Sequence, residues 1–205
     1  MCGRFSRWIG IEIILEKYRP VVETEYHSSY NVAPMSMNPV VRGGGGGRIL
    51  SGMRWGYKSG DKLPINVRSE NLSWSMYAHS FSSRRAIVPA TGFYEWKDGV
   101  PYHITTGDLM NLGAIYTAVN GEMGFAIVTV NASPEMAKIH SRMPLLIRDR
   151  DIDEWLSGDS PEDLLRTSET ALTFTMVSDY VNNPQNDTEL CIKPSKQSSL
   201  EDFFG

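Results

Sequence analysis

The sequence predicts a single α+β domain with a partly closed antiparallel β-sheet or barrel core and a few short helices. Short apolar runs bounded by turn residues recur along the chain, as is typical of antiparallel sheets. Segments with helical periodicity are few, short and set apart from the strands, whereas a parallel α/β fold would alternate the two. The 205 residues, of which 41% are hydrophobic, can build one sizeable core, and two full domains would be cramped.

The first elements expected are a helix and a hairpin. Apolar residues recur at helical spacing over residues 7–18, and Ser6 is of a type that caps helices. Residues 39–55 are typical of a hairpin, and we interpret the glycines at 43–47 as a flexible, solvent-exposed loop. No Gly-Lys-Ser/Thr and no helix follow these glycines, so they do not indicate a phosphate-binding loop.

In the rest of the chain, turn residues separate short strands and helices. Asp98-Gly99 and Asn120-Gly121 are typical hairpin turns, and Ser133-Pro134 is typical of a helix start. The expected strands lie within 85–105 and at 111–119, 124–131, about 144–148 and 171–178, and the expected helices follow Ser133 and lie near 151–157 and 161–166. After about Pro194 the chain becomes polar, which predicts a mobile tail.

Charge and cysteine content narrow the function classes. Residues 151–205 hold three basic and twelve acidic residues, which leaves residues 1–150 with a net charge of +5 in a chain of net charge −4. A basic, arginine-rich segment of this kind suits phosphate oxygens, although it is also compatible with an ordinary solvated surface. Two cysteines exclude a disulfide framework, no spacing matches a zinc module, and no apolar run is long enough to span a membrane. We expect a cytoplasmic monomer without metal or cofactor.

Cys2 carries the most distinctive chemistry. After removal of Met1, this residue would hold a free α-amine and a thiol on one carbon skeleton. The amine can condense with an aldehyde to an imine, and the thiol can then close a five-membered thiazolidine. An α-amine titrates at about pH 8 and a free thiol at about pH 8.5, so useful fractions of both reactive forms exist in neutral solution. On position alone, however, residue 2 is more simply interpreted as the start of a strand.

Several separate segments combine acid or base groups, arginines and aromatic residues, and each alone is weak evidence. Four of them are Met1-Cys2-Gly3-Arg4-Phe5, Asn66-Val67-Arg68-Ser69-Glu70, Gly92-Phe93-Tyr94-Glu95-Trp96 and His140-Ser141-Arg142-Met143-Pro144. Three more are Tyr30-Asn31-Val32-Ala33-Pro34, Met53-Arg54-Trp55-Gly56 and Arg84-Arg85-Ala86-Ile87-Val88-Pro89-Ala90. Together, in this order, they resemble the SOS-response-associated peptidase (SRAP) family of abasic-site-processing proteins over residues 1 to about 180.

The resemblance implies a protein that captures abasic sites in single-stranded DNA by a covalent link through Cys2 and so protects replication forks. It implies the catalytic residues Cys2, Asn66, Glu95 and His140. It implies the DNA-binding residues Arg4, Pro34, Trp55, Arg68, Arg85, Trp96, Thr129, Ser141 and Arg142. Glu95 would help to open the closed sugar to its aldehyde, His140 would move protons, and Asn66 would hold the sugar or the Cys2 backbone.

The DNA-binding set divides by chemistry. The arginines Arg4, Arg68 and Arg142 would bind the flanking phosphates. Three flat side chains, Trp96, Pro34 and Trp55, would offer surfaces to neighbouring bases, each stacked base contributing about 1–3 kcal/mol.

Departures and alternatives remain at this point. Ala86 and Thr91 stand where the family often has a cysteine and an acidic residue, which we expect to change only local packing or hydrogen bonds. A thiol peptidase that cleaves the Met1–Cys2 bond or other proteins is one alternative. A non-catalytic single-strand-binding module is another, and it would need the arginines and aromatic residues but neither Cys2 nor Glu95. A lyase reaction through the imine would compete with ring closure by the thiol.

The last residues form a separate motif. Gln197, Leu200, Phe203 and Phe204 match the pattern Q-x-x-hydrophobic-x-x-aromatic-aromatic, by which replication partners bind PCNA-type sliding clamps. We therefore divide the chain into an SRAP-like domain, 1–192, and a clamp-binding tail, 193–205. The alternative is that the exposed Phe-Phe pair folds back on the protein's own core.

Overall fold

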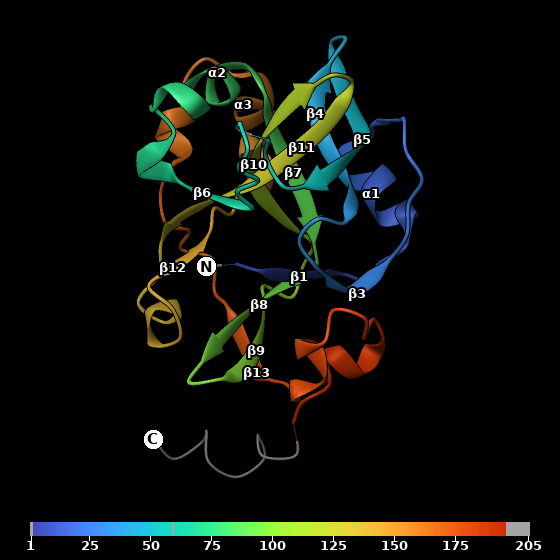
Figure 1. The fold of residues 1–205 in the computed structure, drawn as a ribbon, viewed down its shortest axis with the longest axis vertical. Coiled ribbons are helices and arrows are strands. Elements are labelled where there is room, and N and C mark those ends of the chain that lie inside the picture. Colours follow the sequence, from blue (N-terminus) through green and yellow to red (C-terminus); the bar gives the residue numbers. More distant parts are fainter. Residues whose placement is uncertain (1, 59, 196–205) are drawn as a thin grey trace.

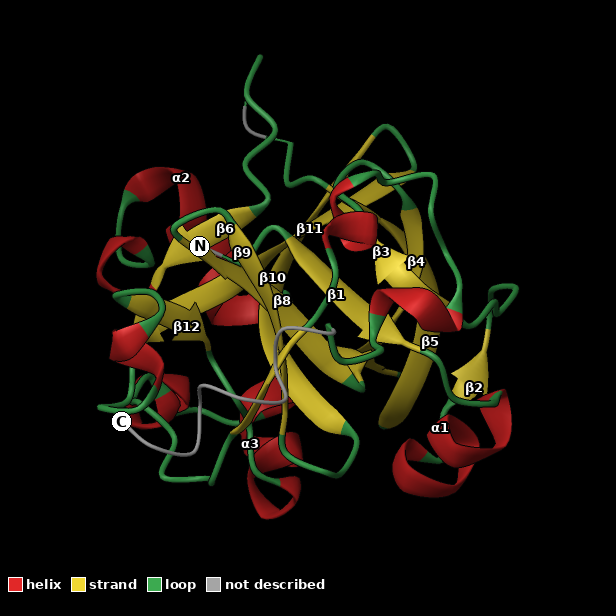
Figure 2. Cartoon of the chain, turned by 90° about the horizontal axis from the view of Figure 1, so that it is seen from below, coloured by secondary structure: helices red, strands yellow, loops and turns green. Residues whose placement is uncertain are grey.

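The computed structural model describes residues 2–58 and 60–195, which form two sheets surrounded by short helices (Figure 1). In chain order the described strands are β1 (Arg4–Arg7), β2 (Val21–Val22), β3 (Ser29–Val32), β4 (Met37–Gly44), β5 (Gly47–Trp55), β6 (Asn66–Arg68), β7 (Arg85–Ala90), β8 (Gly92–Lys97), β9 (Val100–Thr105), β10 (Met110–Val119), β11 (Glu122–Asn131), β12 (Arg142–Pro144) and β13 (Thr173–Met176). The α-helices are α1 (Ile11–Tyr18), α2 (Ser75–Ser83) and α3 (Ile152–Ser157), and Figure 2 shows them around the outside of the strands.

The centre of the fold is a barrel that closes on itself. Within the described residues, strands β11, β10, β7, β4 and β5 pair antiparallel in that order. The barrel closes where β5 pairs parallel with β11, with Arg54 opposite Gly124 and Trp55 opposite Phe125. A Cβ on Gly124 would lie 2.2 Å from the Gly56 carbonyl oxygen, so this close approach requires a glycine. The predicted α+β fold with a barrel core is confirmed.

The second sheet places the N-terminal segment between the barrel and the lower strands. Its order is β13-β9-β8-β1-β3, and β1 pairs antiparallel with β8, Arg4 lying opposite Tyr94. Figure 1 shows β1 passing between the barrel and the β8–β9–β13 strands, with the N-terminal end of β1 on the side of β12 and β6. The ring of Phe5 on β1 lies 5.1 Å from that of Trp55, which joins the sheet to the barrel interior.

The first helix begins later than the periodicity predicts. Arg7, the first residue of the predicted helix, belongs instead to β1 and pairs with Ser29 of β3, and residues 8–10 are not helical. Helix α1 starts only at Ile11, after Gly10. Ser6 therefore does not cap a helix: its Oγ lies 2.9 Å from His103 Nε2 and 3.0 Å from Thr91 Oγ1, inside the second sheet.

The glycine run is also more ordered than the predicted five-residue loop. Strand pairing continues to Gly44 opposite Gly47, so only Gly45 and Gly46 make the connection. Their φ values of 59° and 82° are those of a tight two-residue hairpin turn.

The two hairpin turns and the helix start predicted from local sequence are present in the structure. Asp98-Gly99 and Asn120-Gly121 both adopt positive φ and join β8 to β9 and β10 to β11. Ser133 Oγ accepts a hydrogen bond from the Met136 amide at 3.2 Å, as expected of a helix start. None of the described helices is long and apolar enough to cross a membrane. The clamp motif, Gln197, Leu200, Phe203 and Phe204, lies outside the described residues.

Candidate functional site

Cys2 lies where the barrel, β6 and the second sheet meet. Gly3 separates it from β1, and continuing the β1–β8 register past Arg4 and Tyr94 places it near the end of β8, where Glu95 and Trp96 lie. Its side chain is completely buried, and its Sγ lies 3.6 Å from the Arg4 carbonyl oxygen. Cys2, the expected reactive residue, is therefore buried inside the fold.

Asn66 fixes the Cys2 backbone from the barrel side. Strand β6 pairs parallel with β11, with Asn66 opposite Ile127. The Asn66 Nδ2 group donates a hydrogen bond of 2.7 Å to the Cys2 carbonyl oxygen. The Asn66 Oδ1 atom is buried and accepts no hydrogen bond from the described residues, so it can accept one from a bound group.

The Cys2 thiol is held in its neutral form. Burial raises the pKa of the Cys2 thiol well above its ordinary value, and the negative charge of Glu95 raises this pKa further. Glu95 is on β8 opposite Tyr102 and is 3% exposed. A buried carboxylate is thus near enough to the thiol to influence its proton.

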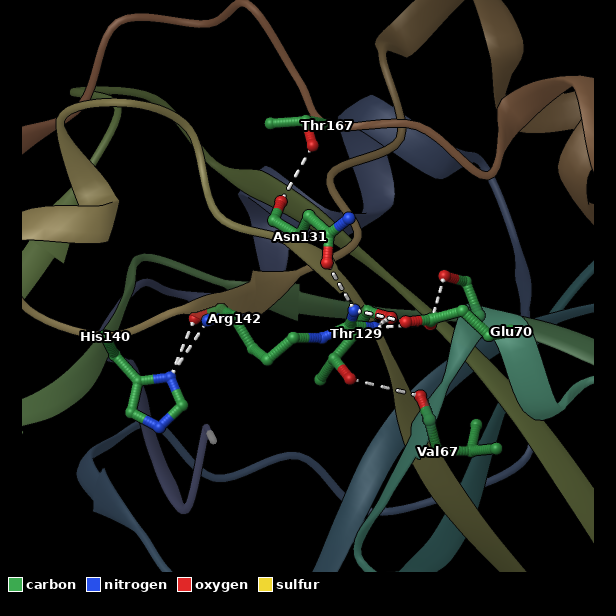
Figure 3. Close-up of polar contacts among 8 residues, drawn as sticks. Val67, Glu70, Thr129, Asn131, His140, Arg142 and Thr167 are labelled. Atoms are coloured by element: carbon green, nitrogen blue, oxygen red, sulfur yellow. Dashed lines mark hydrogen bonds and ion pairs between the residues drawn. The ribbon is translucent and has the colours of Figure 1, made fainter.

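His140 approaches from the segment before β12. Its Nδ1 atom has two contacts with Arg142, and the shorter is the hydrogen bond of 3.0 Å that it accepts from the Arg142 amide (Figure 3). Its 3.2 Å contact with the Arg142 carbonyl oxygen is a hydrogen bond when Nδ1 carries the proton, so the two contacts fit either tautomer of the ring.

Both terminal nitrogens of Arg142 are bound to protein groups. Its Nη1 and Nη2 atoms contact the two carboxylate oxygens of Glu70 at 2.6 and 2.8 Å. The same nitrogens donate to Asn131 Oδ1 at 2.7 Å and to the Thr129 carbonyl oxygen at 2.5 Å (Figure 3). The Arg142 side chain is only 7% exposed. Its expected contact with a phosphate would require a rearrangement of this cluster.

Five of the expected DNA-binding residues have accessible surface. Arg68 and Ser141 are exposed, and Arg4, Pro34 and Trp96 are partly exposed. The Arg68 guanidinium makes no hydrogen bond or ion pair with another described residue, so it is available to a phosphate.

Besides Arg142, three of the expected DNA-binding residues lie inside the fold. Trp55 and Thr129 are fully buried, and their polar hydrogens are donated to the carbonyls of Ile65 and Val67. A fully buried indole ring offers no face to a base, so the expectation of base stacking on Trp55 is corrected. Arg85, also buried, lies at the end of β7 distant from β8 and donates to backbone carbonyls, those of Phe81, Ser82, Trp155 and Gly158.

A C-terminal loop that no sequence motif indicates supports the site. Arg4 donates to the Val181 carbonyl at 3.1 Å, and the Trp96 indole donates to Asn182 Oδ1 at 2.8 Å. Asn31 accepts from Arg4 at 2.8 Å and donates to three carbonyls of the same loop. The only local signal is the run of amide side chains at 182–186. Within the described part of the chain, no group of three His, Cys, Asp or Glu side chains is placed to hold a metal.

Comparisons with known proteins identify related chains. The family model for SOS response associated peptidase (SRAP) matches residues 1–184. Abasic site processing protein YoqW of Bacillus subtilis (strain 168) is 31% identical, with 92% of this chain and 97% of that protein covered. Abasic site processing protein HMCES of Gallus gallus is 28% identical, with 84% of this chain and 68% of that protein covered.

Solved structures show the same fold. A protein from Bacteroides thetaiotaomicron superposes with a TM-score of 0.83 at 17% identity, over 95% of this chain and 100% of that one. A phage-related protein from Bordetella bronchiseptica superposes with a TM-score of 0.71 at 24% identity, over 86% of this chain and 94% of that one. Because the family match covers nearly all of the chain and the fold agrees, the chain belongs to the SRAP family.

Proposed function

We propose that this protein, once Met1 is removed, captures abasic sites in single-stranded DNA as a thiazolidine at Cys2. The relatives named above as abasic site processing proteins support this assignment. The observation that carries it is the position of Cys2: its carbonyl is held by Asn66 at 2.7 Å, and its thiol is in the field of the buried Glu95. A residue with free amine and thiol at that position is suited to an aldehyde.

The proposed reaction joins Cys2 to the C1′ aldehyde of the opened sugar. The α-amine attacks the aldehyde carbon, the carbinolamine loses one water, and a C=N bond replaces the C=O bond. The thiol sulfur then adds to the same carbon, and the thiol proton ends on nitrogen. Glu95 and the His140 ring are the proposed proton carriers for sugar opening and water loss. The free Asn66 Oδ1 atom is the proposed acceptor for a sugar hydroxyl or for the α-amine.

The protonation state of Cys2 favours this order of events. A thiol kept neutral by burial and by Glu95 does not compete with the amine for the aldehyde. Formation of a protonated imine places a positive charge next to the thiol, which lowers the pKa of that thiol and promotes ring closure. Fast closure also suppresses β-elimination, so the lyase reaction is the minor branch of the proposal.

The same observation argues against the peptidase alternative. A cysteine protease attacks as a thiolate, usually because a neighbouring cation lowers the thiol pKa. Here burial and the Glu95 charge raise the pKa of Cys2. Peptidase action is therefore limited, in this proposal, to release of Met1. The alternative of a non-catalytic binding module does not explain why Cys2, Asn66 and Glu95 are buried together.

The DNA strand is proposed to bind across the exposed groups near Cys2. Arg68 and Arg4 would contact flanking phosphates, and Pro34, Trp96 and Ser141 would contact the neighbouring nucleotides. A location at replication forks in the cytoplasm, and delivery there by a PCNA-type clamp through the tail, remain part of the proposal.

Three versions of residue 2 test the chemistry. Purified protein lacking Met1 is incubated with a single strand that carries one abasic site, and adducts are resolved on denaturing gels with and without borohydride. Wild type should give an adduct that needs no borohydride. Cys2→Ser keeps the amine and should give one mainly when borohydride reduces the imine, as should Cys2→Ala. An adduct equally stable in Cys2→Ala without borohydride would refute thiazolidine formation.

A further inference from the structure

Glu70 lies between two segments of the candidate site: β6 with Asn66, called the Asn66 arm, and the start of β12 with His140, called the His140 arm. It belongs to the one-turn helix η1 (Ser69–Asn71), which directly follows β6 and its Asn66. Its carboxylate is bound by both terminal nitrogens of Arg142, at the start of β12. Ser69 Oγ donates to Glu70 Oε2 at 2.9 Å, which further fixes the carboxylate.

The contacts form an unbroken series from Cys2 to His140. The Cys2 carbonyl is bound by Asn66, and Asn66 and Glu70 share the β6–η1 segment. Glu70 binds the Arg142 side chain, while the Arg142 amide binds the His140 ring. The ion pair is thus a direct side-chain contact between the β6–η1 segment with Asn66 and the β12 segment with His140, which are also joined because both β6 and β12 pair with β11 (Figure 3).

The pair is stronger than an ordinary surface ion pair. Exposed pairs contribute little because water screens them, and the Glu70 side chain is indeed 55% exposed. The Arg142 side chain, however, is 7% exposed and its contact with Glu70 is bidentate. Hydrogen bonds from Arg142 lower the pKa of Glu70 to about 2, so the pair stays charged in neutral solution. Loss of Glu70 would leave a buried guanidinium with unpaired donors, which forces local rearrangement.

We propose that Glu70 is a positioning residue for adduct formation, which through Arg142 holds the His140 arm in register with Asn66 and Cys2. This inference rests on the proposed function. Arg142 acts here as an internal support, and the phosphate contacts fall to Arg68 and its exposed neighbours. The opposite hypothesis is that Glu70 occupies a phosphate site, so that DNA must displace it from Arg142.

The test separates DNA binding from the chemical step. Single-turnover adduct formation is measured over a range of concentrations of a strand with one abasic site, which gives a limiting rate constant and a half-saturating concentration. Affinity is measured separately with a strand that carries a non-reactive tetrahydrofuran abasic analogue. Glu70→Ala should lower the limiting rate constant about ten- to a hundredfold, as misplaced reacting groups do, with affinity for the analogue strand changed less than about twofold. Glu70→Gln, which keeps the shape and one acceptor, should lie between wild type and Glu70→Ala.

The matched control is Glu23→Ala. Glu23 also pairs with a largely buried arginine, Arg42, at 3.0 Å, with side chains 47% and 19% exposed. That pair lies beside β2, at the opposite end of the sheet order from β12. The control should leave the limiting rate constant within about twofold of wild type, as surface changes away from a site do.

A second readout does not depend on any reaction with DNA. The ring carbon–proton resonances of the four histidines are recorded by NMR, with His140→Gln to assign one of them. Glu70→Gln should move the His140 resonance and leave His27 and His79 unchanged. An unmoved His140 resonance, an unchanged rate constant, or tighter binding of the analogue strand by Glu70→Ala would overturn the positioning role. Failure of wild type to form any adduct would instead refute the proposed function, while the NMR result would still test the structural link.

Discussion

Replacing Gly92 by alanine should destabilise the protein, because His103 occupies the space that a Cβ atom would need. That atom would lie 2.2 Å from His103 Nε2 and 2.8 Å from Cε1. The His103 ring is buried. Its Nε2 atom forms a 2.9 Å hydrogen bond with Ser6 Oγ, and its centroid lies 4.8 Å from that of the Tyr94 ring. It therefore cannot move without loss of contacts on both β1 and β8, the strands that position Cys2 and Glu95.

The expected magnitude follows from these contacts. Overpacking a tight core costs about 1–3 kcal/mol, and loss of the Ser6–His103 hydrogen bond adds about 1 kcal/mol. The free energy of unfolding should therefore fall by about 2–4 kcal/mol. For a protein of this length, that lowers Tm by roughly 5–15 °C.

Thermal denaturation followed by circular dichroism measures the effect. Gly47→Ala is the matched control, because a Cβ there meets nothing within 4 Å. The double variant Gly92→Ala/His103→Ala should be less destabilised than the sum of its single variants, since the removed ring makes room for the methyl group. A Gly92→Ala Tm equal to that of wild type, or strictly additive single variants, would refute the packing argument.

Three further predictions concern pH, the Asn66 contact and DNA binding. Burial lowers the pKa of His103 in the folded protein to about 4, so as the pH falls from 6.5 this residue is protonated in the unfolded chain before it is protonated in the folded one. In urea denaturation, the free energy of unfolding of wild type should therefore fall between pH 6.5 and 4 by on the order of 3 kcal/mol more than that of His103→Gln. Equal losses in the two proteins would contradict this. Asn66→Ala removes the 2.7 Å hydrogen bond to the Cys2 carbonyl and should slow adduct formation about tenfold with little change in Tm; an unchanged rate would show that the contact is not needed. Arg68→Ala should reduce the slope of log affinity against log salt by about 0.7 for a single strand with a non-reactive abasic analogue, while the exposed Arg150→Ala should not; equal slopes would remove Arg68 from the phosphate contacts.

Local chemistry made much of the sheet predictable. Asp98-Gly99 and Asn120-Gly121 specify their turns because those residue types tolerate positive φ, which does not depend on distant contacts. The start of α1 was not predictable, because the periodicity of residues 7–18 carries no information on the pairing of β1 with β8 about 90 positions away. The length of the turn in the glycine run is not predictable either, because the outer glycines are paired across the hairpin.

The site likewise contains residues that the sequence motifs indicate and supporting contacts that they do not indicate. Cys2, Asn66 and Glu95 were expected together only because several motifs resemble one family, and the structure places them together. The supporting contacts join residues far apart in the chain: Glu70 to Arg142 across 72 positions, and Trp96 to Asn182 across 86. No periodicity or motif marks such pairs. The burial of Trp55 was hidden too, because the barrel closes only when β5 returns to β11.

Intact mass spectrometry of the protein with an abasic single strand tests the central claim most directly. The proposed chemistry predicts that Met1 is absent and that the adduct mass equals the protein plus the DNA minus one water, without borohydride. Peptide mapping should place the DNA remnant on Cys2, and Cys2→Ala should give no such species. A protein without Met1 that forms no adduct, or an adduct mapped to another residue, would contradict capture at Cys2.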